Sequence, residues 1–289
     1  MTDGIQSLWD QMRADLLSDA LPDLERACQS LLDGSLGPLT APQTEDLQSV
    51  ERSVEKLARR LNGEPIDWGD YSEAAHALRG PLNSTLGFSR LILKGIDGPI
   101  NQAQQEAVET IHATSRRLLA LFNLLLDALL LLGDGVILKI EAVRAGEVLE
   151  EVTTVGRALA KNLDFVFEAH LHEGTASTVI QCDATRLNQA LSGLLAVAAK
   201  YMHGGRINLA ASREEKRLCI RLVNQACQLP ELLMGEIPAL LNGQPNASVP
   251  YDAQLRLGIA WHLLMQMNAQ LTATRSGDAC TFGITLPTH

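Results

Sequence analysis

The sequence has few aromatic residues, no paired cysteine motif and no excess of basic charge, and each absence excludes a class of protein. Aromatic residues make up 4% of the 289 positions, so a core must be built largely from aliphatic side chains. The 5 cysteines are widely spaced and form no C-x-x-C pair, which disfavours a zinc site or a disulfide framework and favours reduced thiols. Acidic residues outnumber basic ones by 34 to 24, and the net charge of −10 disfavours nucleic acid as a partner.

Long apolar runs are also missing. The most apolar stretch, Leu118–Leu132, contains Asn123 and Asp127 and is shorter than the ~20 residues that cross a bilayer. The first residues lack a basic segment followed by an apolar one, so they do not resemble a signal peptide. We therefore expect a cytoplasmic protein with no membrane insertion. An apolar share of 46% with 20% charged residues is typical of a folded chain.

Two patterns divide the chain. Residues 1–134 repeat apolar positions every three or four residues, and glycine–proline clusters at 34–38, 63–65 and 95–99 mark turns between helices. Beyond them the pattern predicts strands at 136–143, 165–171, 206–211, 218–223, 271–275 and 281–286, and helices at 146–162, 183–201 and 251–268. The predicted fold class is α followed by α+β, with helical hairpins in a four-helix-bundle-like domain before an α/β sandwich.

The helical part contains an internal similarity. Residues 31–61 match residues 92–122 at a constant offset of 61, which aligns Gly34 with Gly95 and Gly37 with Gly98. This indicates either a duplicated hairpin or a chance likeness between two amphipathic helices with similar turns. The predicted domains are a first hairpin at 1–66, a second at 67–134 and an α/β domain at 135–289.

The most informative segment, residues 72–93, reads SEAAHALRGPLNSTLGFSRLIL. It resembles the phosphoacceptor segment of two-component sensor histidine kinases, H-[ED]-L-R-[TN]-P-L, from His76 to Leu82. The resemblance implies a helical hairpin that exposes His76 as the phosphoacceptor, with Arg79 orienting the phosphoryl group. It also implies a docking surface for a response regulator at Leu82, Thr85 and Leu86.

Two positions depart from that pattern. Ala77 replaces the acid that accepts the histidine's proton, and Gly80 replaces the Thr or Asn that supports dephosphorylation of the partner. Glu73, one helical turn before His76, is a candidate substitute for the missing acid. The alternative is an idle, solvated histidine. At the offset of 61, Asp15 stands where the second hairpin has His76, so the first hairpin lacks a phosphoacceptor.

Residues 136–289 resemble the Bergerat-type ATP-binding domain of the same kinases, through segments such as DATRLNQALSGLLAVAAKY and CTFGITLP. Its three nucleotide-binding motifs are degenerate. The two asparagine positions of the magnesium-binding helix, the adenine-binding D-x-G-x-G and the glycine-rich lid fall on Gly193, Val197, Asn224, Ala226, Gln228, Asp252, Gln254 and Arg256.

These replacements remove the chemistry of the site. Valine offers no oxygen to Mg²⁺, side chains at 226 and 228 replace a close backbone approach, and a carboxylate at 252 repels phosphate. We therefore expect neither ATP nor Mg²⁺ as a cofactor, and no other metal. The pocket is then filled by its own side chains or holds another ligand.

The sequence leaves three functions open. The first is a histidine phosphotransferase that exchanges phosphoryl groups with a response regulator through His76. The second is a non-catalytic adaptor that binds a response regulator or a sensor kinase, and the third is a divergent but active histidine kinase. The duplicated hairpins allow either a monomer with an intramolecular bundle or a homodimer.

Overall fold

The computed structural model describes residues 3–132, 136–200, 205–226 and 249–288. They form two compact units, one within Ile5–Leu129 and one that begins at Leu130. The first unit is helical and the second combines helices with sheets, as the sequence predicts. The predicted boundaries at 66/67 and 134/135 stay predictions.

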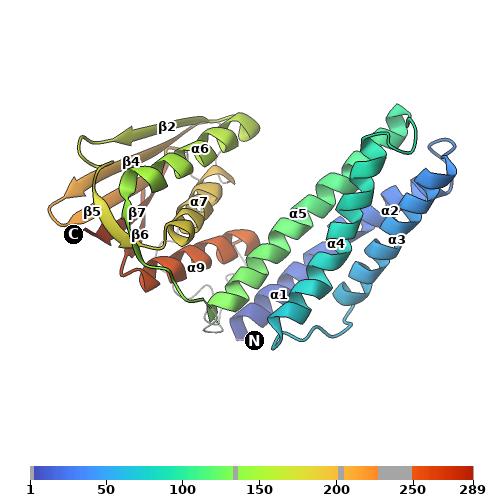
Figure 1. Cartoon of the computed structure of the whole chain (residues 1–289), viewed down its shortest axis with the longest axis horizontal. Helices are drawn as coiled ribbons and strands as arrows, with labels where there is room; N and C mark the ends of the chain where they lie inside the picture. The colour runs from blue at the N-terminus through green and yellow to red at the C-terminus, as the bar shows by residue number, and fades with distance from the viewer. Residues whose placement is uncertain (1–2, 133–135, 201–204, 227–248, 289) are drawn as a thin grey trace. The chain divides into compact units, whose positions relative to one another are not determined.

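The first unit is a bundle of long helices (Figure 1). A nearly continuous helical segment comprises α1 (Asp3–Asp15), the π-helical turn η1 (Leu16–Ala20) and α2 (Leu21–Leu32). It is followed by α3 (Ala41–Leu61), α4 (Tyr71–Leu93) and α5 (Gln102–Leu132). The helices end at the predicted glycine–proline turns, because proline and left-handed glycine do not continue a helix.

Both predicted hairpins contribute to one core. Leu24 of α2, Leu57 of α3, Leu78 of α4 and Phe122 of α5 are all buried. The ring of Phe122 lies 6.3 Å from that of Trp9 in α1, so the first and last helices of the unit meet. The apolar stripes of the four helical segments therefore cover one another within a single chain.

The turns of the two hairpins bind each other through equivalent glutamines. Gln43 Nε2 donates to the carbonyl oxygens of residues 98 and 99, at 3.0 and 3.3 Å. Gln104 Nε2 donates to the carbonyl oxygens of residues 37 and 38, at 3.2 and 3.1 Å. Donors and acceptors are both related by the offset of 61 residues.

The residues that precede these helices repeat the exchange. Thr40 Oγ1 donates to the carbonyl oxygen of Asp97 at 2.9 Å, and Asn101 Nδ2 donates to that of Leu36 at 2.7 Å. The backbone conformations of the two turns are also equivalent. Gly37 and Gly98 have φ values of 108° and 110°, in a region that favours glycine. The similarity seen in the sequence thus extends to backbone conformation and to hydrogen bonding.

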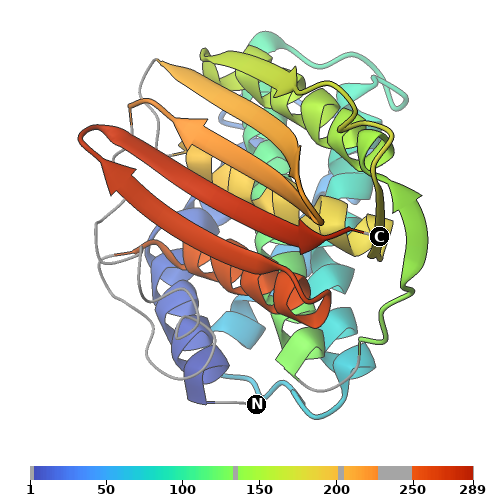
Figure 2. The same cartoon turned by 90° about the vertical axis from the view of Figure 1, so that its left-hand side faces the viewer.

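The second unit is an α/β sandwich. Its five-stranded sheet has the order β2 (Val166–Leu171), β4 (Arg206–Glu214), β5 (Arg217–Asn224), β7 (Ala279–Pro287) and β6 (Gln270–Ser276). Strands β2 and β4 are parallel and the other neighbours are antiparallel. Helices α6 (Ala145–Leu163), α7 (Ala184–Lys200) and α9 (Tyr251–Gln266) cover one face of the sheet (Figure 2).

Two details of this unit differ from the sequence prediction. The strand expected at 136–143 is wrong over most of its length, because β1 spans only Glu141–Arg144. Its antiparallel partner β3 (Val179–Cys182) was not predicted at all. Cys28, Cys182 and Cys219 are free, but Cys280 is disulfide-bonded, so the expectation of fully reduced thiols is wrong for Cys280.

Candidate functional site: the His76 pocket and the nucleotide-domain positions

Helix α4 places His76 on its outer side. The helix begins after Asp70, whose carboxylate accepts hydrogen bonds from the backbone N–H groups of Ser72 and Glu73 at 2.8 and 3.1 Å. Such a cap satisfies amides that have no partner within the helix. Ala75 and Leu78 face the core, whereas His76 is exposed, as the family resemblance implies.

The imidazole lines a pocket between α3 and α4 that has a volume of about 380 Å³. Helix α4 contributes His76, Gly80 and their neighbours, and α3 contributes the cationic side chains Lys56, Arg59 and Arg60. Glu64, just after α3, also lines the pocket and lies 3.5 Å from Arg60 Nε. The pocket thus combines a potential nucleophile with an excess of positive charge.

Two departures from the family pattern adjoin the imidazole. A Cβ atom at Gly80 would lie 3.8 Å from His76 Cε1, so glycine leaves open space beside the ring. Ala77 lines the pocket without offering a proton acceptor. Glu73, the candidate substitute, is not among the described residues that line this pocket.

Arg79 is directed to α5 rather than to the pocket. Its Nε donates to Asn123 Oδ1 at 2.6 Å and its Nη2 to the Tyr71 hydroxyl at 3.3 Å. The guanidinium carbon also lies 5.9 Å from the centroid of the Tyr71 ring. These contacts tie α4 to α5, and they do not support the expected role of Arg79 in orienting a phosphoryl group.

The predicted docking surface is wrong at two of its three residues. Leu82 and Thr85 are each 1% exposed, because they continue the buried stripe of α4 that begins at Leu78. Thr85 Oγ1 donates to the carbonyl oxygen of Pro81 at 3.0 Å. Leu86 is half-buried and lines a second pocket, of about 660 Å³, between α4 and α5.

In the α/β unit, the positions of the magnesium-binding helix pack against protein. Val197 is 1% exposed. A Cβ atom at Gly193 would lie 3.7 Å from the backbone oxygen of Arg256, which brings α7 close to α9 at that point. Neither side chain supplies an oxygen ligand.

At the predicted adenine-binding position, the carboxamide of Asn224 is buried and forms hydrogen bonds within the protein. Asn224 is 1% exposed, its Nδ2 donates to the carbonyl oxygen of Ala198 at 2.8 Å, and its Oδ1 accepts from the Ala226 N–H at 2.9 Å. Gln228, the next position of this motif, lies outside the described residues.

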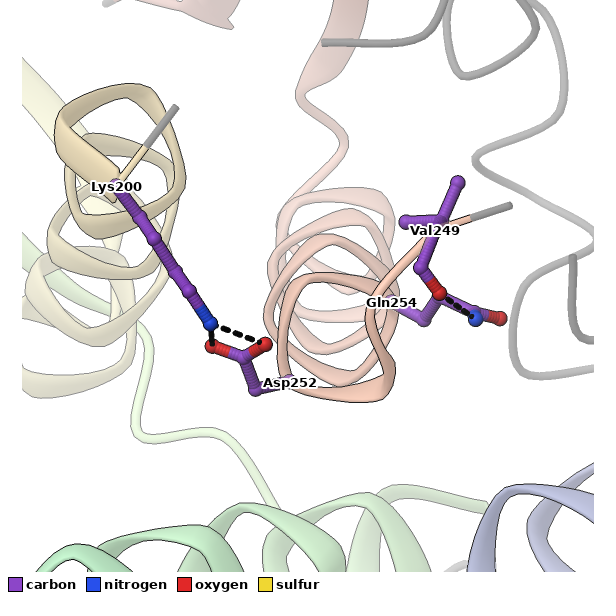
Figure 3. Close-up of polar contacts among 4 residues, drawn as sticks. All are labelled: Lys200, Val249, Asp252 and Gln254. Atoms are coloured by element: carbon purple, nitrogen blue, oxygen red, sulfur yellow. Dashed lines mark hydrogen bonds and ion pairs between the residues drawn. The ribbon is translucent and has the colours of Figure 1, made fainter. Parts of the chain in front are cut away.

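The three lid positions lie on α9. Figure 3 shows the contacts of two of them, Asp252 and Gln254. Both carboxylate oxygens of Asp252 lie 2.8 Å from Lys200 Nζ, and Gln254 Nε2 donates to the carbonyl oxygen of Val249 at 2.6 Å. Burial lowers the pKa of the Arg256 guanidinium, and the negative charge of Asp252 opposes that shift. A charged, helical segment therefore stands where the family has a glycine-rich lid.

Comparison with known proteins shows which family this chain resembles. Residues 72–128 match the model of the His Kinase A (phospho-acceptor) domain. The autoinducer 2 sensor kinase/phosphatase LuxQ of Vibrio cholerae is 27% identical over 249 residues, which cover 83% of this chain and 28% of LuxQ. The circadian input-output histidine kinase CikA of Synechococcus elongatus is 26% identical over 77% of this chain and 30% of CikA. The chain is thus similar to two-component sensor histidine kinases over most of its length.

A solved histidine kinase structure shares the fold of this chain. Full-length ShkA, solved in complex with AMPPNP, has a TM-score of 0.63 at 22% identity and covers 75% of this chain and 45% of ShkA. The chain spans less than a third of the length of LuxQ and CikA. Among the described helices, none is both long and apolar enough to span a membrane.

Proposed function

We propose that this protein is a histidine phosphotransferase that exchanges phosphoryl groups with response regulators without using ATP. The observation that carries the proposal is the exposed His76 in a pocket lined by three cationic side chains. An exposed imidazole is reachable by the active site of another protein, and the cations favour an anionic group beside it.

The transfer needs no group that the pocket lacks. In its neutral form, His76 has one ring nitrogen with a free electron pair, which attacks the phosphorus of an aspartyl phosphate. The bond between phosphorus and the aspartate oxygen breaks, and its electron pair remains on the released carboxylate. The second ring nitrogen keeps its proton. Transfer to the next receiver domain reverses these steps, so the acid missing at Ala77 is not required for this exchange.

Two contacts and one side-chain replacement support loss of the ATP-dependent reaction. The carboxamide of Asn224 is hydrogen-bonded within the protein, and Val197 offers no ligand to Mg²⁺. Asp252, at the start of α9, forms an ion pair with Lys200. A nucleotide would have to break the Asn224–Ala198 and Lys200–Asp252 contacts and would bind without its usual metal ligand. A response regulator supplies an already activated phosphoryl group, so the protein can act without a nucleotide.

The proposal is tested with a receiver domain phosphorylated by labelled acetyl phosphate. We expect acid-labile, alkali-stable label to appear on the wild type and on His172→Ala, an exposed histidine of the α/β unit, but not on His76→Ala. Incubation with labelled ATP should give no label. An ATP-dependent signal lost in His76→Ala would instead identify an active histidine kinase.

A second candidate, the non-catalytic adaptor, is favoured by the changes next to the histidine. Ala77 and Gly80 both remove side chains that the family uses at the phosphoacceptor. An adaptor would bind a receiver domain or a sensor kinase equally well as the wild type and as His76→Ala, and would take up no label. We place either role in the cytoplasm.

A further inference from the structure

Building on this proposed function, we propose that the first hairpin, which lacks a phosphoacceptor, supplies the phosphoryl-binding side of the His76 pocket. Lys56 and Arg59 of α3 then hold the oxygens of the phosphoryl group while it moves to or from His76 of α4. The pocket is thus a composite site, with the nucleophile from one hairpin and the anion-binding groups from the other.

The spacing of the cations suits this role. Lys56, Arg59 and Arg60 are separated by three and four residues, which places them on one side of α3. Arg60 is already engaged, since its Nη1 donates to the carbonyl oxygen of Pro65 at 2.6 Å and its Nε faces Glu64. Within the described part of the chain, Lys56 and Arg59 form no ion pair, and both are exposed.

The internal repeat provides a comparison within the same molecule. At the offset of 61 residues, Lys56 corresponds to Arg117, but Arg59 and Arg60 correspond to the uncharged Ala120 and Leu121. The same offset relates His76 to Asp15. The repeat-related set of positions, Asp15 with Arg117, Ala120 and Leu121, therefore lacks both the histidine and two of the three cations.

The joint absence of the histidine and of two cations at the repeat-related positions favours a functional role for the cations over a structural one. A cation needed only for packing or solubility of the bundle would be expected in both halves, because their turns and buried stripes are alike. Instead all three cations occur only at the α3 positions that share a pocket with His76. A phosphoryl group carries up to two negative charges, and arginine and lysine bind its oxygens through charge-assisted hydrogen bonds.

The ligand chemistry is a phosphoryl dianion, either on His76 or on the incoming aspartate. Cations beside the reacting phosphorus stabilise the charge on its oxygens during transfer. They are not required for the receiver domain to dock. The rate of the transfer step and the affinity for the unphosphorylated receiver should therefore respond differently to their removal.

The test compares Lys56→Gln/Arg59→Gln with Arg117→Gln, which removes a charge at the repeat-related position. We expect the double variant to slow single-turnover transfer at saturating receiver by about tenfold or more. Arg117→Gln should stay within about twofold of the wild type, since solvent screens distant exposed charges. Affinity for the unphosphorylated receiver, measured by calorimetry, should change little in either. Equal transfer rates in the double variant and Arg117→Gln would overturn the inference.

A second readout does not depend on transfer. Inorganic phosphate is titrated into the full-length protein while the imidazole signals of His76 are followed by NMR. We expect saturable shifts in the wild type and in Arg117→Gln that are lost in Lys56→Gln/Arg59→Gln. If the wild type takes up no label, the phosphotransferase proposal fails, yet these shifts still report the anion site. If His76 shows no phosphate-dependent shift in the wild type, the anion site itself is refuted.

Discussion

At the scale of single residues, Asn224 stands where the resemblance to histidine kinases predicts an adenine-binding aspartate. Its carboxamide acts as a donor to Ala198 and as an acceptor from Ala226 within the buried interior. An aspartate, which the family carries here, cannot donate to a carbonyl oxygen. In this chain the Asn224 side chain therefore forms hydrogen bonds within the unit.

The substitution Asn224→Asp tests this reading. We expect the family residue to lower the free energy of unfolding by about 2 kcal/mol, because it places a carboxylate against the Ala198 carbonyl and removes a buried hydrogen bond. It should not restore ATP binding. Chemical denaturation and calorimetry with Mg·ATP measure the two effects, and Asn268→Asp, at an exposed position, is the control. Tight ATP binding by Asn224→Asp would contradict the prediction.

A second residue-scale prediction concerns Asp46 of α3. Burial raises the pKa of its carboxyl group, and the hydrogen bond and negative charge of Asp97 raise it further. A raised pKa means that the folded state binds the proton more tightly than the unfolded state, so stability falls as pH rises through that pKa. Asp46→Asn removes this loss.

We therefore expect Asp46→Asn to melt at a higher temperature than the wild type at neutral pH. The difference should shrink as pH falls below the ordinary carboxyl range. Thermal unfolding followed by circular dichroism across acid to neutral pH measures it. Asp19→Asn, at an exposed site, should show no comparable trend. A variant that gains stability only in acid would have the opposite sign to that predicted.

At the scale of elements, the sequence predicts the helical unit better than the α/β unit. Glycine–proline turns and long apolar periodicity fix the ends of α3, α4 and α5, whereas β3 has only four residues and carries little periodic signal. The family pattern predicts docking at Leu82 and Thr85, but helical phase contradicts it. Leu78, Leu82 and Thr85 follow a spacing of four and three, which assigns them to the core.

Parts of the site that depend on contacts distant in sequence were not predicted. Nothing local to Lys56 or Arg59 indicates that they face His76, because the pocket forms only when α3 packs beside α4. Packing of α4 against α5 likewise determines that Arg79 donates hydrogen bonds to the Tyr71 hydroxyl and to Asn123 Oδ1. The internal repeat is the sequence feature that indicates the pocket. At the offset of 61 residues, the equivalents of His76, Arg59 and Arg60 are neither histidine nor cations.

The exchanged glutamines give a prediction for the paired turns. Gln43→Ala and Gln104→Ala should each lower the free energy of unfolding by about 1–3 kcal/mol, because each removes two part-buried hydrogen bonds to the opposite turn. Gln48→Ala, on the exposed side of α3, is the control and should change stability little. Denaturation curves of the singles and of the double variant also give the coupling between the turns. A large loss for one glutamine and none for the other would contradict the pairing of equivalent turns.

At the scale of the whole molecule, the first unit contains within one chain the helices that close its bundle. Two hairpins bury each other's apolar stripes, and their turns are joined by reciprocal hydrogen bonds. A second chain could complete such a bundle only by exchanging a hairpin, which would lose these contacts and form equivalent ones at the entropic cost of association. The contact of Trp9 with Trp68, whose rings are 5.1 Å apart, adds a link between α1 and the segment that joins the hairpins.

We therefore expect a monomer. Light scattering coupled to size-exclusion chromatography should give the single-chain mass of 31.3 kDa, unchanged over a wide range of concentration. A homodimer that dissociates in Gln43→Ala/Gln104→Ala would show that the paired turns belong to exchanged hairpins of two chains. A mass of one chain would instead make the composite His76 pocket intramolecular, so mixing His76→Ala with Lys56→Gln/Arg59→Gln could not restore phosphoryl transfer by subunit exchange.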